Sequence, residues 1–298
     1  MNTKYFQTGG FTITVNADMP FKDDTFHPKF RPFKAAGPGR ENIVVNHFFK
    51  KPPAETAPGG KRLYYKKPWA IYDQGDRILY EWMATELPGS TFLRKMIANK
   101  DHTRLDIFHD DLLAGQFKKG GLQDITLLPT DQILLSRVLG FHKGCLIHSL
   151  GLIFKGNGFL FVGHSGAGKT TIARMMMPES TILCDDRNII RERQDAFQLH
   201  GTWKYSELEE ISPETAPLKG IFFIRQADDN KIVPIADSKT RFYLIMDHLV
   251  KSLVTPDWME ATLDVVEKIS KQIKCYYMYF NQTGQVKKLI NQLCSEGG

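Results

Sequence analysis

Alternating apolar and polar positions predict β-strands at two places in the first third of the chain. Residues 10–18 (GFTITVNAD) alternate with the two-residue period of a strand that buries one face. Residues 69–83 (WAIYDQGDRILYEWM) hold two such runs joined by the turn Asp73–Asp76, which favours a hairpin. Between these regions, residues 50–68 are rich in Pro, Gly and Lys, and this composition predicts a solvated loop or flap.

The pattern becomes more regular from residue 128. Residues 129–141 carry apolar side chains at helical spacing, with Thr130 and Asp131 as capping candidates and Gly140 as the expected end. We therefore predict a boundary here, with an N-terminal α+β domain at residues 1–127 and a second domain at residues 128–298.

Buried strands and a short helix are predicted for the first half of the second domain. Residues 144–163 (GCLIHSLGLIFKGNGFLFVG) are almost continuously apolar and predict two or three strands, broken at Gly151 and at residues 155–158. The short apolar runs TILC (181–184) and APLKGIFFIRQ (216–226) predict further strands. The run IARMMM (172–177) predicts a helix that Pro178 stops.

Two helices are predicted near the end of the sequence. Thr255 and Pro256 are a typical cap and first residue, and residues 284–293 (GQVKKLINQL) repeat the helical spacing. The expected apolar stripes are Met259, Leu263, Val266 and Ile273 in the first helix and Val286, Leu289, Ile290 and Leu293 in the second.

Composition narrows the class of protein. The chain has 298 residues, 42% of them hydrophobic, which is typical of a folded globular protein. The net charge of +6 is spread over both halves, so nucleic acid is not an expected partner. No apolar run is long enough to span a membrane and no secretory signal is recognisable. The four cysteines are widely spaced, which favours reduced thiols in a cytoplasmic protein.

Residues 159–171 (FLFVGHSGAGKTT) contain the motif G-x-x-x-x-G-K-[ST] of a phosphate-binding loop. An apolar strand precedes the motif and a helix-compatible run follows it, which is the context that such a loop needs. The predicted nucleotide-binding residues are Gly163, His164, Ser165, Gly166, Ala167, Gly168, Lys169, Thr170 and Thr171.

The chemistry of this loop predicts ATP and Mg²⁺ as ligands. Its glycines allow backbone N–H groups to turn toward phosphate oxygens, and the following helix adds its positive end. Lys169 is expected to reach the β- and γ-phosphates, and the Thr170 hydroxyl is expected to bind Mg²⁺.

Two adjacent carboxylates, Asp185 and Asp186, follow the predicted strand TILC. One can hold Mg²⁺ while the other accepts a proton from an attacking hydroxyl, so the pair favours a kinase. A solvated turn or a helix cap is the alternative interpretation.

The segments 146–171 and 182–191, with HGTW and APLKGIFFI further on, resemble the HPr kinase/phosphorylase-like kinases over about residues 140–225. The resemblance implies a phosphoenolpyruvate-carboxykinase-like P-loop kinase domain. It also implies that Asp185 accepts the proton, that Asp186 assists at the metal, and that His148 lies near the catalytic carboxylate. His164 and Thr171 stand where the bacterial serine kinases of this family usually carry Asp and Glu, which is typical of a diverged branch.

The expected function is transfer of phosphate from ATP to a hydroxyl, in particular a serine of a protein or peptide. A small-molecule alcohol kinase and a nucleotide-sensing module without transfer remain alternatives, and a homo-oligomer is compatible with the resemblance. His200 and Trp203 either face the acceptor or pack in the core. The basic residues of 50–68 either contact an acidic or nucleic-acid partner or form a charged surface loop, and we favour the loop.

Overall fold

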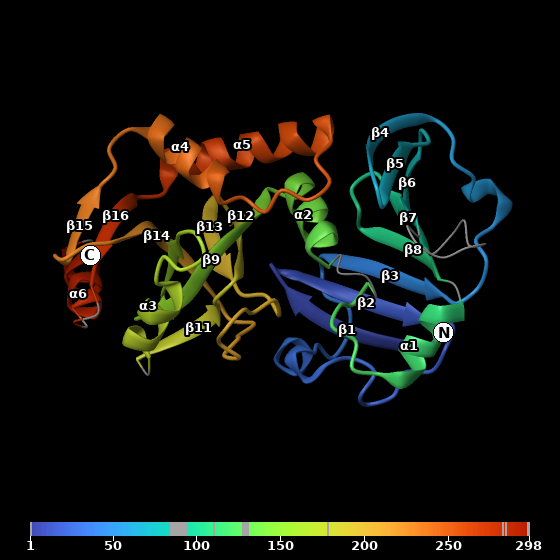
Figure 1. The fold of residues 1–298 in the computed structure, drawn as a ribbon, viewed down its shortest axis with the longest axis horizontal. Helices are drawn as coiled ribbons and strands as arrows, with labels where there is room; N and C mark the ends of the chain where they lie inside the picture. The colour runs from blue at the N-terminus through green and yellow to red at the C-terminus, as the bar shows by residue number, and fades with distance from the viewer. Residues whose placement is uncertain are drawn as a thin grey trace. The chain divides into compact units, whose positions relative to one another are not determined.

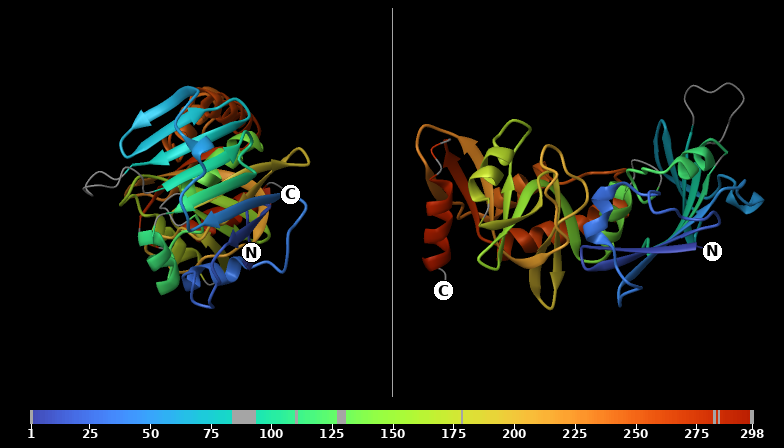
Figure 2. Two further views of the ribbon diagram at one scale, coloured as in Figure 1. Left: turned by 90° about the vertical axis from the view of Figure 1, so that its right-hand side faces the viewer. Right: turned by 90° about the horizontal axis from the view of Figure 1, so that it is seen from below.

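The computed structural model describes residues 2–83, 94–109, 111–126, 131–177, 179–281, 283 and 285–296. The chain divides into an N-terminal unit (Met1–Phe141 with Lys251–Glu260) and a C-terminal unit (His142–Val250 with Ala261–Gly298). Each unit contains one large sheet, so the protein is mixed α/β (Figures 1 and 2). The predicted boundary between residues 127 and 128 lies outside the described residues and stays a prediction.

The N-terminal unit is built on a sheet of order β1-β2-β3-β8-β7-β6-β5-β4, in which only β2–β3 and β3–β8 are parallel. Its strands are β1 (Asn2–Thr8), β2 (Phe11–Ala17), β3 (Asn42–Phe48), β4 (Lys61–Lys66), β5 (Trp69–Asp73), β6 (Arg77–Trp82), β7 (Arg94–Asn99) and β8 (Arg104–His109). Its helices are α1 (Asp111–Lys119), α2 (Asp131–Phe141) and the 3₁₀ turns η1 (Pro28–Phe33) and η2 (Ala54–Thr56).

The predicted strand at 10–18 and the predicted hairpin at 69–83 are confirmed as β2 and as β5–β6. The interpretation of residues 50–68 as a loop is wrong for its second half. Residues Lys61–Lys66 form β4 and pair antiparallel with β5. β4 is a largely exposed edge strand, and charged side chains are typical of such edges, so its lysines resembled those of a loop.

The C-terminal unit has a sheet of order β10-β9-β12-β13-β14-β16-β15, with β11 beside β9. A further parallel pairing of β10 with β14 closes the strands β10, β9, β12, β13 and β14 into a ring. The strands are β9 (Gly144–Phe154), β10 (Asn157–Val162), β11 (Ser180–Cys184), β12 (Arg187–Arg193), β13 (Ala196–His200), β14 (Thr215–Gln226), β15 (Lys231–Pro234) and β16 (Cys275–Phe280). The helices are α3 (Lys169–Met176), α4 (Ser238–Asp247), α6 (Val286–Glu296) and α5 (Pro256–Gln272), whose first residues, as far as Glu260, belong to the N-terminal unit.

Helices α3 and α6 cover one face of the parallel strands β10, β14 and β16. Ile172 and Met176 of α3 and Ile290 of α6 are fully buried against aromatic side chains such as Phe161 and Phe222. Burial of these large side chains is the main source of stability for this layer, and it fixes the start of α3 at the end of β10.

Two predicted boundaries in this region need correction. No break occurs at Gly151, because β9 runs without interruption through it. A Cβ at Gly151 would lie 2.3 Å from Asn188 Oδ1, so this glycine permits a close approach of the Asn188 amide. Helix α2 ends at Phe141, one residue after the predicted end, and Gly140 is buried within it. Thr130 and Pro178 lie outside the described residues.

The predicted helices near the end of the sequence are confirmed as α5 and α6. The stripe of α5 differs in part, since Trp258, Val265 and Ile269 are buried while Met259 and Leu263 are only half-buried. All four cysteines are free thiols. None of the helices in the described part of the chain is long and apolar enough to cross a membrane.

Candidate functional site

The predicted phosphate-binding loop connects β10 to α3, as the sequence indicates. Gly168 is the N-cap of α3 and has φ +104°, a conformation that L-residues rarely adopt. A Cβ at Gly168 would lie 2.3 Å from Phe280 Cζ, so the ring of Phe280 also requires a glycine there. Gly166 has φ +77°. These two left-handed positions turn the backbone of the loop before the helix begins, as in an anion-binding nest.

Lys169 lies at the centre of the site and is only 9% exposed. Its Nζ donates to the carbonyl oxygens of Gly163 (2.7 Å) and His164 (3.2 Å), and it lies 3.2 Å from Nε2 of His148. Three acceptors match the three N–H groups of an ammonium, so His148 Nε2 accepts and His148 carries its proton on Nδ1. Burial lowers the pKa of Lys169, and the charges of Asp186, Asp185 and Glu207 oppose that shift.

His148 connects Lys169 to Asp186. It lies on β9, and its Nδ1 is 2.9 Å from Asp186 Oδ1. Backbone bonds fix both residues, because His148 N donates to His248 O and Ser149 N donates to Asp186 O. Burial alone would raise the pKa of Asp186, but the hydrogen bond from His148 and the nearby Arg187 lower it overall. The site therefore contains a chain of contacts from lysine through histidine to an ionised carboxylate.

Asp185 has a different environment from its neighbour. It is 3% exposed, and its two oxygens accept backbone hydrogen bonds from Ser206 N (2.7 Å), Glu207 N (2.8 Å) and Leu208 N (2.9 Å). The carboxylate therefore anchors the 206–208 segment. A sequence pattern does not reveal this, because the three donors are backbone groups of a distant segment.

The rest of the predicted loop is arranged around this centre. His164, Ser165 and Gly166 are exposed, whereas Ala167, Thr170 and Thr171 are half-buried. The ring of His164 lies 5.0 Å from that of His248, which follows α4. Burial, followed by the nearby His164 and His148, lowers the pKa of His248, although its bond to Leu244 O opposes the shift.

Two residues next to the loop were not among the sequence candidates. Gln226, the last residue of β14, donates from Nε2 to Gly166 O (3.0 Å) and holds the tip of the loop. Its position at the carboxyl end of an apolar strand was the available signal, because β14 and β10 are parallel and end at the same edge. His248 had no signal in the sequence.

A hollow of about 510 Å³ lies beside the start of α3. Its lining residues are Gly168, Thr171, Gln226, Ala227, Asp228, Phe280 and Asn281. Its size is within the range of small-molecule sites, and its lining includes Gly168 and Thr171 of the predicted phosphate-binding loop.

The predicted metal ligands Thr170, Asp185 and Asp186 do not form a complete cage. Among the described residues, no group of three or more His, Cys, Asp or Glu side chains is arranged to hold a metal ion. Mg²⁺ in nucleotide sites usually takes one or two protein oxygens and completes its shell with phosphates and water. The Asp186 carboxylate and the Thr170 hydroxyl are oxygen ligands of the type that such a partial set uses, whereas the oxygens of Asp185 already accept three hydrogen bonds.

His200 and Trp203 are both buried, at 3% and 2% exposure. His200 Nδ1 lies 2.8 Å from Thr215 Oγ1 on the neighbouring strand, and burial lowers the pKa of His200 to about 4. Of their two predicted roles, packing in the core agrees with this environment.

Comparison with known proteins gives one family match. The family model described as SynChlorMet cassette protein ScmC matches residues 118–295, which is more than half of the chain. Among curated proteins no match is found. Among solved structures, the HPr(Ser) kinase/phosphatase from Coxiella burnetii is similar at 10% identity and a TM-score of 0.31, over 51% of this chain and 88% of that chain.

Proposed function

Within the family of the SynChlorMet cassette protein ScmC, to which this chain belongs, we propose that the chain is a Mg²⁺-dependent kinase that transfers the γ-phosphoryl group of ATP to a hydroxyl. The observation that carries the proposal is the position of Lys169. It lies at the end of a glycine-turned loop, and its Nζ is in contact with His148, which in turn contacts Asp186.

The loop and the hollow beside it bind different parts of ATP. The backbone N–H groups of residues 163–170 and the start of α3 bind the phosphates, since both present partial positive charge. The hollow lined by Gly168, Thr171 and Gln226 is adjacent and receives the remainder of the nucleotide. Asp186 and Thr170 would hold Mg²⁺, which would supply charge neutralisation for the phosphates.

His148 is the group that we propose as proton acceptor. Its Nε2 accepts a hydrogen bond from Lys169. Phosphate oxygens attract the lysine ammonium, which leaves the Nε2 lone pair available for the proton of an acceptor hydroxyl. Asp186 keeps the other nitrogen protonated and stabilises the imidazolium that forms.

The transfer then balances without further reactants. The hydroxyl oxygen forms a bond to the γ-phosphorus while the bond to the bridging oxygen breaks, ADP leaves, and the hydroxyl proton moves to His148. Asp185, the proton acceptor that the sequence resemblance implies, is the alternative to His148 as the base. The contacts favour His148 with Asp186, because both Asp185 oxygens accept backbone hydrogen bonds.

The acceptor that we propose is a serine of a protein or peptide, and a small-molecule hydroxyl is the alternative. The test is transfer of label from γ-labelled ATP with Mg²⁺ into an extract of the source cells, separated into protein, peptide and small-molecule fractions. We expect label in the protein or peptide fraction with wild type and its loss with Asp186→Asn.

The same experiment separates the alternatives. Label that appears only in the small-molecule fraction would identify an alcohol kinase. Tight ATP binding without label in any fraction would overturn the kinase proposal in favour of a nucleotide-sensing module.

A further inference from the structure

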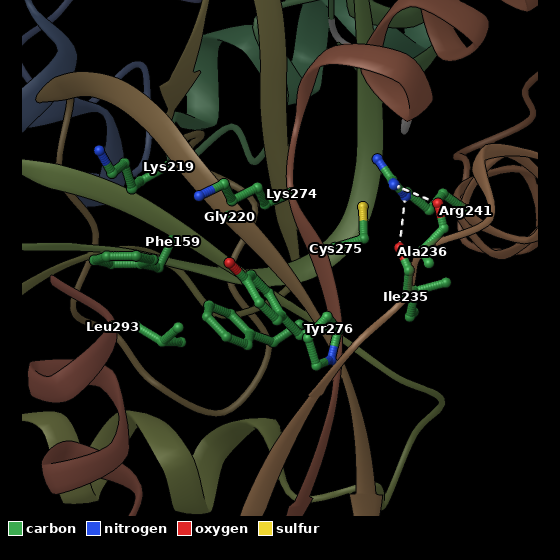
Figure 3. Close-up of a pocket in the computed structure, with 12 residues that line it drawn as sticks. Phe159, Lys219, Gly220, Ile235, Ala236, Arg241, Lys274, Cys275, Tyr276 and Leu293 are labelled. Atoms are coloured by element: carbon green, nitrogen blue, oxygen red, sulfur yellow. Dashed lines mark hydrogen bonds between the residues drawn. The ribbon is translucent and has the colours of Figure 1, made fainter. Parts of the chain in front are cut away.

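A second cavity in the C-terminal unit lies far from the phosphate loop. It has a volume of about 420 Å³ and is formed near the amino ends of β10 and β16 and at the middle of β14, whereas the loop follows the carboxyl end of β10 (Figure 3). Gly220 in the cavity and Gln226 at the loop are six residues apart on β14, about 20 Å along an extended strand. The cavity is therefore not part of the site described above.

One wall of the cavity is aromatic. The ring of Phe222 lies 5.2 Å from that of Tyr276 in a stacked arrangement and 6.0 Å from that of Phe159. Leu293 of α6 completes this wall, and Figure 3 shows it beside Phe159 and Tyr276. Such a surface favours a flat apolar group, because aromatic rings stack or meet edge to face at these separations.

Gly220 leaves the floor of the cavity open. Its backbone has no left-handed conformation, and a Cβ there would meet no atom closer than 3.5 Å. The strand could therefore hold a larger residue, and glycine within a strand weakens it by about 0.5–1 kcal/mol relative to alanine. A glycine that the fold does not require, facing a cavity, is typical of a place where a ligand approaches the backbone.

The strand is also irregular at this point. Gly158 pairs with Leu218 and Phe159 with Gly220, so Lys219 is an extra residue on β14. A bulge of this kind changes the direction of the side chain that it carries. At this bulge the side chain is a lysine that lines the cavity.

The charged side chains around the cavity are all cationic. Lys219, Lys274 and Arg241 line it, and none of the twelve described lining residues is Asp or Glu. Arg241 is held in place by bonds from Nε to Ile235 O (2.7 Å) and from Nη2 to Ala236 O (2.7 Å), shown dashed in Figure 3. The guanidinium of Arg241 is therefore a positive charge in a fixed position. Lys219 and Lys274 add two further positive charges on flexible side chains.

We propose that this cavity binds a small organic anion with a flat apolar body, of the class of aromatic carboxylates. The ring of the ligand packs against the aromatic wall, in the space that Gly220 leaves free. Its carboxylate pairs with the cationic side chains of Lys219, Lys274 and Arg241. Binding is non-covalent, because burial raises the pKa of the Cys275 thiol in the lining to about 12. This proposal does not depend on the kinase proposal.

The test uses 2-naphthoate as the probe and 2-naphthamide as its neutral counterpart, with binding to the full chain measured by titration calorimetry. We expect naphthoate to bind about tenfold more tightly than the amide, since only the anion makes charge-assisted contacts. Gly220→Val should lower naphthoate affinity at least tenfold by filling the floor, and Lys274→Gln about threefold.

Two control variants separate a loss of naphthoate binding at the cavity from misfolding and from binding at the loop. Gly220→Ala makes only ordinary contacts at its Cβ and should fold as wild type while weakening naphthoate. Lys169→Ala, at the phosphate loop, should leave naphthoate binding unchanged. Equal affinity for naphthoate and naphthamide, or naphthoate binding that Gly220→Val and Gly220→Ala leave unaltered, would overturn the proposal.

Discussion

At the scale of single residues, Asp185 and Asp186 are adjacent in sequence but differ in what they contact. The first accepts three backbone N–H groups and the second pairs with His148. The sequence predicts that a carboxylate pair follows a strand at 181–184, and the structure confirms this position at the end of β11. Which partner each one contacts depends on the distant segments 206–208 and 144–154, so the sequence pattern could not assign it.

This difference predicts unequal effects of the same substitution on stability. Asp185→Asn places an amide against backbone donors and should lower the free energy of unfolding by roughly 2 to 3 kcal/mol. Asp186→Asn keeps an oxygen for the His148 Nδ1–H bond and should change stability little. Urea unfolding of both variants measures this, and equal stability of the two would contradict the assignment of the Asp185 oxygens to the 206–208 segment.

At the scale of elements, the strand, loop and helix around the phosphate motif follow the prediction because each is specified locally. The apolar run, the glycines and the helix-compatible run lie within residues 159–177. Predictions failed where the structure depends on distant contacts. Gly151 permits the approach of Asn188, and the 61–66 edge strand is defined by its pairing with β5.

The phosphate loop should not tolerate a side chain at Gly168. Gly168→Ala combines a φ of +104° with a Cβ placed 2.3 Å from Phe280 Cζ, so it should displace the loop or the ring. We expect at least a tenfold loss of ATP affinity, measured by titration calorimetry. Gly115→Ala in helix α1 is the matched control, because nothing lies within 4 Å of its Cβ, and it should bind ATP as wild type. Normal ATP affinity of Gly168→Ala would show that the loop does not need this geometry.

At the scale of the whole molecule, both units bury neutral histidines. Burial lowers the pKa of His47 and His102 in the N-terminal unit and of His200 in the C-terminal unit to about 4 in each case. In the unfolded chain these histidines bind a proton near pH 6.5, whereas in the folded chain they remain neutral down to about pH 4. Their contribution to the free energy of unfolding is therefore constant above pH 6.5, and it decreases as the pH falls from 6.5 to 4.

We therefore expect the free energy of unfolding to fall as the pH decreases from 7 to 5, by roughly 2 kcal/mol for each of these histidines. Urea unfolding at several pH values measures the slope. His102→Asn removes one titrating group, and asparagine accepts the left-handed backbone at this position (φ 57°), so its slope should be shallower. If wild type and variant had the same slope, buried His102 would not be a source of the pH dependence.

The function proposed for the C-terminal unit depends on the phosphate loop more than on any other feature, and Lys169 is its central residue. The most direct measurement is the affinity for ATP with Mg²⁺ of wild type and Lys169→Ala, with Lys155→Ala at the exposed β9–β10 turn as control. We predict that wild type and Lys155→Ala bind equally and that Lys169→Ala binds at least tenfold more weakly. Equal affinity of all three proteins, or no binding by wild type, would contradict the assignment of residues 163–170 as a nucleotide site.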